Sequence, residues 1–146
     1  MSTKILGNNY LLWIESAVAG TYNYPLGQGN LSITRSSSKV DTTSKDDGRY
    51  GSSGPGLIDL GVSLEIMPKL PDATGYTRLE TLSLANPPAP FNIQIRKNGT
   101  SGASGDVVFQ CSVYGNLDSS DFNQNAAGSV KASFVAAAAP TVDTLA

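Results

Sequence analysis

The stretch Gly61-Val-Ser-Leu-Glu-Ile-Met67 alternates between apolar and polar residues. In an extended strand, successive side chains point to opposite faces. The aliphatic side chains then share one face: Val62, Leu64 and Ile66. Ser63 and Glu65 share the other face. The stretch is therefore predicted to be a strand with one side on an apolar core and the other side in water or in contact with another molecule.

Similar alternation recurs on both sides of this stretch. Strands are predicted before it at residues 10–16 and 31–35, and after it at residues 91–96, 106–115 and 129–135. Segments rich in Gly, Ser, Thr and Pro separate them, as is typical of strands joined by turns. Asn98-Gly99 is a strong turn dipeptide, so residues 98–105 are predicted to form the tip of a hairpin.

One segment has helical spacing instead. Tyr76, Leu79 and Leu82 recur every three residues, and Asp72 can cap the helix start. Three prolines follow at positions 87, 88 and 90 and would end it. A single helix between two strands, packing its apolar stripe on a β layer, predicts a mostly β (α+β) fold: a β-sandwich or barrel-like sheet with one packed helix.

The 146 residues suit one domain, residues 1–146. Residues 36–56 are polar and glycine-rich, and an irregular connection of this length inside a compact domain usually has a task. The expected task is contact with another molecule. Residues 137–146 have little to pack against, which predicts a tail that is mobile or becomes ordered only in an assembly.

The composition limits the possible functions. Hydrophobic residues make up 40% of the chain and charged residues only 15%, which indicates surfaces that another molecule covers. The net charge is -2 and the basic residues are scattered, which argues against tight nucleic-acid binding. The apolar stretch at residues 10–14 is far shorter than the ~20 residues of a membrane span, so no membrane partner is expected.

The chain has no histidine and one cysteine, so nucleophile pairs of the Ser-His or Cys-His type are excluded. Only oxygen ligands remain for a metal. The acidic run from Asp41 fails the calcium-loop pattern because Lys45 occupies a ligand position. We therefore expect no enzyme, metal or cofactor. Cys111 lies in an apolar strand and is interpreted as a small buried hydrophobic residue.

The aromatic residues suggest an alternative function, the binding of another molecule at a surface site. Trp13 lies in the most apolar strand and is predicted to be in the core. Tyr22, Tyr24 and Tyr50 fall in predicted loops, where contact with a protein is favoured over nucleic acid because no basic groove accompanies them. In a carbohydrate-binding β-sandwich, the same tyrosines could form a surface site with two acids: Asp46 and Asp47.

The segment Lys39-Val-Asp-Thr-Thr-Ser-Lys-Asp-Asp-Gly48 resembles the long loop of siphophage major tail proteins, the tail tube proteins of long-tailed bacteriophages. Other segments resemble that family in the same order: residues 56–67 its next strand, 72–82 its helix, 113–117 its penultimate strand and 116–136 its closing hairpin. The Arg49-Tyr50 pair departs from the family, in which an aromatic residue often follows a glycine directly. The resemblance covers nearly the whole chain.

This resemblance implies a structural virion protein whose subunits form rings, commonly hexamers, that stack into the tail tube through which DNA passes. Its partners would be further copies of itself and the tape-measure, tail-tip or baseplate and tail terminator proteins, with only transient, non-specific passage of DNA. Its location would be the virion tail, assembled in the host bacterial cytoplasm. The tube protein of type VI secretion shares this design and is the alternative within the same structural class.

The long loop is expected to make the contacts between copies. Its proposed contact residues are Asp41, Thr42, Thr43, Ser44, Lys45, Asp46, Asp47, Arg49 and Tyr50. A neutral or acidic strand face lining the bore would let DNA pass without binding, because no fixed cations would meet its phosphates. The candidates for this lumen face are Ser63, Glu65, Asn92 and Gln94.

Overall fold

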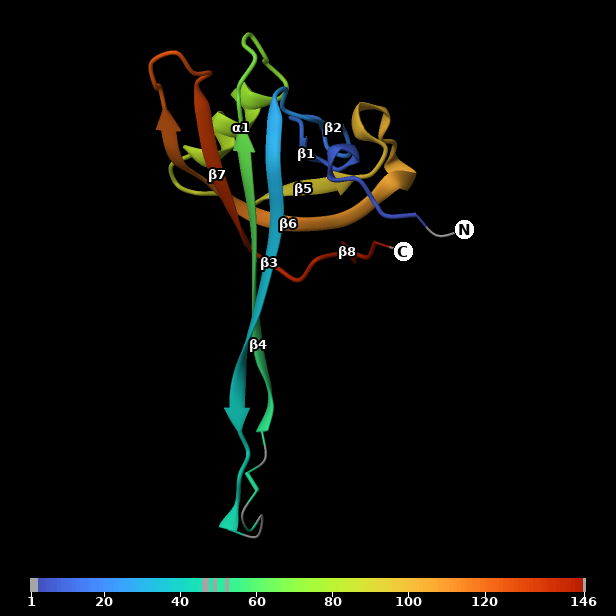
Figure 1. Cartoon of the computed structure of the whole chain (residues 1–146), viewed down its shortest axis with the longest axis vertical. Coiled ribbons are helices and arrows are strands. Elements are labelled where there is room, and N and C mark those ends of the chain that lie inside the picture. Colours follow the sequence, from blue (N-terminus) through green and yellow to red (C-terminus); the bar gives the residue numbers. More distant parts are fainter. Residues whose placement is uncertain (1–2, 46–47, 49, 52, 146) are drawn as a thin grey trace.

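The computed structural model describes residues 3–45, 48, 50–51 and 53–145 (Figure 1). Its main feature is one antiparallel sheet in the strand order β2-β1-β5-β6-β7-β4-β3, with β8 paired to β6. The strands are β1 (Leu11–Glu15), β2 (Tyr22–Asn23), β3 (Gln28–Asp41), β4 (Ser53–Ile66), β5 (Phe91–Arg96), β6 (Val107–Asp121), β7 (Ser129–Ala136) and β8 (Val142–Asp143). The helix α1 (Tyr76–Ser83) packs beside the sheet. Short 3-10 helices are η1 (Gly7–Asn9), η3 (Gly99–Ser101) and η4 (Ser104–Asp106).

The alternation that predicted the fold is confirmed in β4. Its aliphatic residues at positions 62, 64 and 66 are buried, whereas Ser63 is exposed. Every predicted strand is present, and β5 has the predicted bounds. Their inward side chains form one apolar core together with α1, so the fold is mostly β with one packed helix, as predicted. The largest fully buried core residues include Leu12, Ile14, Leu64, Ile66, Leu79, Ile93, Phe109 and Phe134.

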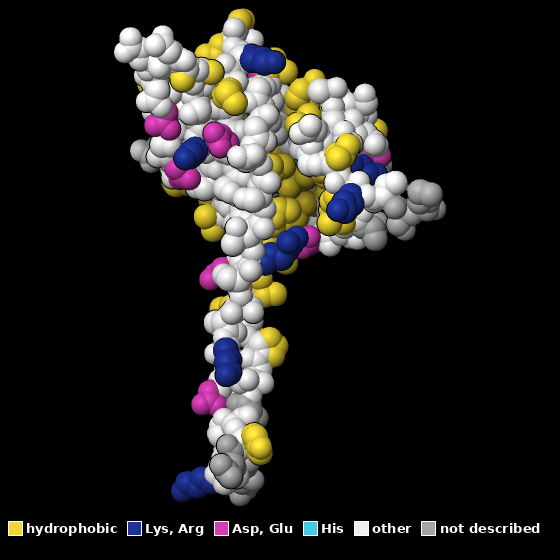
Figure 2. Space-filling model, in the orientation of Figure 1, with side chains coloured by type: hydrophobic (Ala, Val, Ile, Leu, Met, Phe, Trp, Pro, Cys, Tyr) yellow, Lys and Arg dark blue, Asp and Glu magenta, His cyan; other side chains and the backbone are white. Residues whose placement is uncertain are grey.

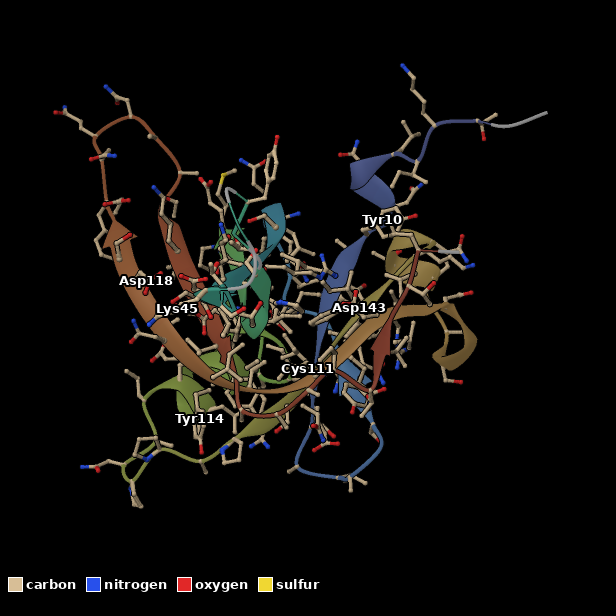
Figure 3. The ribbon with its side chains drawn as sticks, turned by 90° about the horizontal axis from the view of Figure 1, so that it is seen from below. Tyr10, Lys45, Cys111, Tyr114, Asp118 and Asp143 are labelled. Carbon is tan, nitrogen blue, oxygen red and sulfur yellow. The ribbon has the colours of Figure 1, made fainter. Side chains whose placement is uncertain are left out.

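The sheet curls until its two ends face each other. Strand β6 bends strongly (Figure 3), because its first half pairs with β5 and its second half with β7. Strands β1 and β3 then approach without forming a backbone ladder among the described residues. The side chain of Gln28 bridges them: Leu12 N–H donates to its Oε1 at 2.9 Å, and its Nε2 donates to Leu12 O at 2.8 Å. The result is barrel-like.

The helix is held at both ends by particular residues. It begins at Tyr76, and Asp72 acts at its start because Oδ2 accepts the backbone N–H of Tyr76 at 3.0 Å and that of Leu26 at 2.9 Å. Near its other end, α1 lies close to Gly115, where a Cβ would come within 2.7 Å of Phe91 Cζ and 2.8 Å of Ser83 Oγ. Any larger residue at position 115 would require these side chains to shift.

The strands around the predicted long loop are longer than the sequence pattern suggests. Residues 36–41 continue β3 and residues 53–56 begin β4, so residues 42–52 are all that separates the two strands. Strand β6 likewise continues to Asp121 instead of ending near 115. In β3, residues 34–41 are exposed on both faces, so no apolar alternation marks them as a strand in the sequence.

The C-terminal residues 137–145 run along β6. The N–H groups of Ala137, Thr141 and Thr144 donate to carbonyl oxygens of β6 at 2.8–2.9 Å. Asp143 of β8 forms an ion pair with Arg35 of β3. The sequence predicts few packing partners for this tail. In the structure the tail bonds mainly to the backbone edge of β6, and such pairing leaves no pattern in the side chains.

Replacing Gln28 by Ala should lower the free energy of unfolding by about 1–3 kcal/mol, because both backbone groups of the buried residue Leu12 lose their partner. Chemical denaturation measures this change. Gln124→Ala, in the exposed turn between β6 and β7, is the matched control and should be nearly neutral. Equal stability of the two variants would contradict the bridging role of Gln28.

Candidate interaction surfaces

The paired ends of β3 and β4 project far from the core as an arm, defined here as residues 36–58 (Figure 1). The pairing runs from Ser36 opposite Asp59 to Asp41 opposite Ser53. At about 3.3 Å per residue, residues 36–41 extend roughly 20 Å. A two-stranded ribbon of this kind is marginally stable alone in water. The arm is therefore a candidate surface for contact with another molecule.

The arm carries large apolar side chains in water. Val40 is 48% exposed, Leu57 84%, Ile58 68% and Tyr50 86%. None of these side chains belongs to the core. Burying an aliphatic side chain is worth about 1.5–3 kcal/mol, so a partner covering several of them would bind with appreciable free energy.

Most predicted contact residues of the long loop lie at the outer end of the arm. Asp41 ends β3, and its carboxylate accepts the N–H of Thr43 at 2.9 Å. Hydrogen bonds from the side chain and backbone of Thr43 lower the pKa of Asp41, so this carboxylate is charged at neutral pH. Thr42, Ser44 and Lys45 are exposed beside it. Tyr50 lies near the tip, and the remaining three predicted residues lie outside the described residues: Asp46, Asp47 and Arg49.

The outward side chains of β3, β4, β7 and the second half of β6 form a polar face. One row crosses all four strands through pairs of facing residues: Ser32, Ser63, Ser133 and Asn116. Asp118 joins this row by accepting hydrogen bonds from Asn116 Nδ2 at 2.7 Å and from Ser133 Oγ at 2.9 Å. In the next row, Glu65 stands opposite Lys131. The face is mainly hydrophilic with charges of both signs, and the exposed Val135 lies in the row on the other side of the serines.

The four predicted lumen residues do not share one surface. Ser63 and Glu65 lie on the polar face. Asn92 and Gln94 lie on β5, separated from β4 by β6 and β7 in the sheet. Gln94 is only 7% exposed, and its amide contacts Gln110 and Arg96 at 3.0 and 2.9 Å. Alternation alone could not show this difference, because it does not reveal what covers the outer side of a strand.

The outer side of β1 and β5 is closed by a cluster around Arg96. Trp13 is buried, as predicted, but it lies under Arg96, whose Cζ is 4.4 Å from the Trp13 ring centroid. Tyr24 packs edge-on against Trp13 at 4.8 Å. Tyr22 donates to Glu15 at 3.3 Å, and burial followed by the Glu15 charge raises the pKa of Tyr22. Tyr22 and Tyr24 therefore pack against the fold, so the three tyrosines do not form one exposed site.

Cys111 is buried in the core, as predicted from its place in an apolar strand. Burial raises the pKa of its thiol, which keeps the less reactive protonated form at neutral pH. Across the described part of the chain, no helix is long and apolar enough to cross a membrane.

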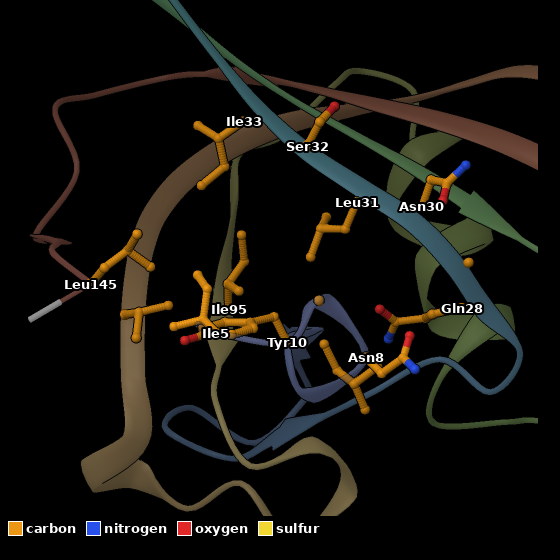
Figure 4. Close-up of a pocket in the computed structure, with 14 residues that line it drawn as sticks. Ile5, Asn8, Tyr10, Gln28, Asn30, Leu31, Ser32, Ile33, Ile95 and Leu145 are labelled. Atoms are coloured by element: carbon orange, nitrogen blue, oxygen red, sulfur yellow. The ribbon is translucent and has the colours of Figure 1, made fainter. Parts of the chain in front are cut away.

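A groove of about 720 Å³ lies along the edge of β3 and was not predicted from the sequence. Figure 2 shows apolar side chains in the hollow beside this strand. Several of them point toward one another across it (Figure 4). Its apolar lining includes Ile5, Tyr10, Leu31, Ile33, Ile95 and Leu145. The alternation at residues 31–35 correctly predicted inward side chains for Leu31 and Ile33, but not that the sheet would stay open beside them.

Comparison with known proteins decides the fold. No family model matches the chain, and no curated protein matches its sequence. The tail of an empty gene transfer agent particle, refined with C6 helical symmetry, matches with a TM-score of 0.76 at 14% identity, over 97% of this chain and 100% of that one. The SPP1 tail tube matches with a TM-score of 0.69 at 13% identity, over 97% of this chain and 83% of that one. The chain has the tail tube fold.

A chain of the native gene transfer agent virion also matches, with a TM-score of 0.67 at 15% identity over 94% of this chain and 97% of that one. The fold that the sequence resemblance implied is therefore confirmed. The match covers nearly the whole chain, so the sheet and helix described above belong to the shared tail tube fold.

Replacing Arg96 by Ala should lower the free energy of unfolding by at least about 1 kcal/mol, because the cation and its aliphatic stem cover Trp13. Trp13 is the only tryptophan, so its fluorescence reports the exposure of this ring directly. Lys97→Ala, at the exposed neighbouring position, should leave both stability and fluorescence unchanged. An unchanged fluorescence spectrum in the Arg96 variant would show that Arg96 does not cover the Trp13 ring.

Proposed function

We propose that this chain is the structural subunit of a phage tail tube, in which rings of copies stack around a channel for DNA. Two observations support the proposal. The first is the tail tube fold over nearly the whole chain. The second, which carries most weight, is the arm: a ribbon with exposed Leu57, Ile58 and Tyr50 has no covering partner among the described residues of its own chain.

The predicted contact residues at the outer end of the arm fit this role. Asp41 and Lys45 offer opposite charges to a neighbouring copy, and Tyr50 offers a large amphipathic ring, a residue type enriched in protein interfaces. The exposed aliphatic residues nearer the core add apolar area. In this proposal the arm joins one copy to a copy in the same or the next ring.

The polar face is the proposed lumen surface. Its serine row and its paired Glu65 and Lys131 present no uncompensated cluster of cations, so phosphate groups would find no strong binding site. Ser63 and Glu65 remain the proposed lumen residues from the sequence. Because Gln94 is buried, β5 is not part of this proposed surface.

The role proposed is structural and not enzymatic. The gene transfer agent structures are virion and tail assemblies, which supports a location in the virion tail. Assembly in the host cytoplasm is part of the proposal. The proposed partners are other copies in hexameric rings and the tape-measure, tail-tip or baseplate and terminator proteins, with DNA passing transiently. The carbohydrate-binding alternative is not favoured, since Tyr22 and Tyr24 pack beside Trp13 and Tyr50 lies on the distant arm. The type VI alternative is not favoured either, because the structures reported above are tail assemblies.

Shortening the arm should abolish polymerisation without unfolding the subunit. We expect a variant in which an Asn-Gly turn replaces residues 39–56 to stay a β-rich monomer, because the core lies outside the arm. Electron microscopy should show rings or tubes for the parent chain and none for the variant. Circular dichroism and the denaturation midpoint verify folding. Tubes of normal length from the shortened chain would disprove the role of the arm.

A cysteine placed on the polar face should become shielded on assembly. Ser63→Cys should react with both small and bulky maleimides in isolated subunits, but only with the small reagent in tubes, if this face lines the bore. Thr81→Cys on α1 is a control for general reactivity, and native Cys111 is buried and adds little background. Labelling of Ser63→Cys by the bulky reagent at equal rates before and after assembly would exclude a lumen position.

A further inference from the structure

In the described part of the chain, polar contacts close the curled sheet at the two ends of its seam, and the groove beside β3 lies between them. At one end, Gln28 bridges to Leu12. At the other end, Arg35 pairs with Asp143. Between these contacts, the consecutive residues Asn30 to Ile33 all line the groove, which shows that it runs along the edge of the strand and not along one face.

This edge can accept another strand. Strand β3 is the last strand of the sheet order, so its outer backbone groups have no ladder partner among the described residues. A free edge beside an apolar hollow is the arrangement that binds an extended peptide by strand addition: backbone hydrogen bonds supply affinity and alternate side chains fill the hollow.

The chemistry of the groove restricts its occupant. Its lining is aliphatic or aromatic with neutral polar residues at the rim, including Asn8, Gln28, Asn30 and Ser32, and no charged residue lines it among those that the structure describes. Placing an unpaired charge in such a hollow is costly, so the occupant should be uncharged and apolar. It should also be extended, with a free edge of its own.

Residues 53–58 of the arm, Ser-Gly-Pro-Gly-Leu-Ile, form an uncharged stretch that exposes two large aliphatic residues, Leu57 and Ile58. Val18 and Phe122, in contrast, lie in turns, and Val135 lies in β7, which is paired on both sides. Residues 53–58 are already extended, as the first part of β4. Strand β7 pairs with β4 from Gly61 onward, which leaves the other edge of residues 53–58 unpaired.

We propose that residues 53–58 of one copy dock in the β3 groove of the next copy, edge to edge, with Leu57 or Ile58 in the apolar hollow. The arm points away from its own groove (Figure 1), so the contact joins two molecules. It uses different surfaces on the two partners, and such contacts build closed rings or open polymers. The inference rests on the proposed self-assembly and assigns the receptor surface for the arm.

Cross-linking tests this assignment. The double variant Ile5→Cys/Leu57→Cys places one thiol at the groove and one on the docking segment, and both positions are exposed, so folding should be preserved. Mild oxidation of its assemblies should give covalent ladders longer than dimers. The matched control is Phe122→Cys/Leu57→Cys, in which the equally exposed Phe122 lies away from the groove. This control should give no ladder.

A charge test is independent of the thiols. Leu57→Asp should raise the concentration needed for assembly at least about tenfold, because it brings a carboxylate into an uncharged hollow. Leu70→Asp, at a similarly exposed residue outside the arm and the groove, should assemble like the parent chain.

The outcomes separate the two proposals. Ladders through Ile5→Cys together with the Leu57→Asp defect support the groove as receptor. Assemblies that give ladders through Phe122→Cys instead, or that tolerate Leu57→Asp, overturn the groove assignment while self-assembly stands. Failure of the parent chain to assemble under any condition, with other virion proteins present, overturns self-assembly and the groove assignment with it.

Discussion

The structure depends on one constraint: a single sheet must curl around one core, and the bend of β6 makes it do so. Strand β6 is shared between β5 on one half and β7 on the other, so its curvature brings the ends of the sheet together. The ends meet through side chains and not through a backbone ladder. The incomplete closure leaves β3 at an open edge beside the groove, and β3 and β4 extend past the core as the arm.

The sequence predicts the parts of this fold in which side chains report their surroundings. Alternating residues in β4, β5 and β7 face a core on one side, and Tyr76 and Leu79 mark the helix in the same way. The strands of the arm were not predicted because both of their faces are exposed to solvent. The pairing of the C-terminal tail was not predicted because the tail bonds to a backbone edge. The bridging role of Gln28 could not be predicted from its neighbours in the sequence, since its partner Leu12 lies 16 residues away on another strand.

The candidate site residues were also predicted only in part. The sequence predicted a contact segment near Asp41 and Lys45 from its polarity and its resemblance to a family. The structure places these residues on the arm, and their contact with another copy stays a prediction. The predicted lumen set was only partly brought together, because Gln94 alternates like Ser63 but lies beneath Arg96 and its neighbours. Burial of a polar strand face by side chains from the same and neighbouring strands is a tertiary effect that period-two patterns do not contain.

Open strand edges normally threaten a protein with unspecific aggregation, and most proteins blunt them with charges, prolines or bulges. This chain does so only in part. Bulges interrupt β3, and Pro55 lies in the arm, yet residues 53–58 have no charge and the groove has none either. Leaving two matching edges unprotected is reasonable if each is the intended partner of the other. If copies of the chain cover these surfaces, as proposed, the low overall charge has a physical explanation, because an isolated subunit would need charge on them to stay soluble.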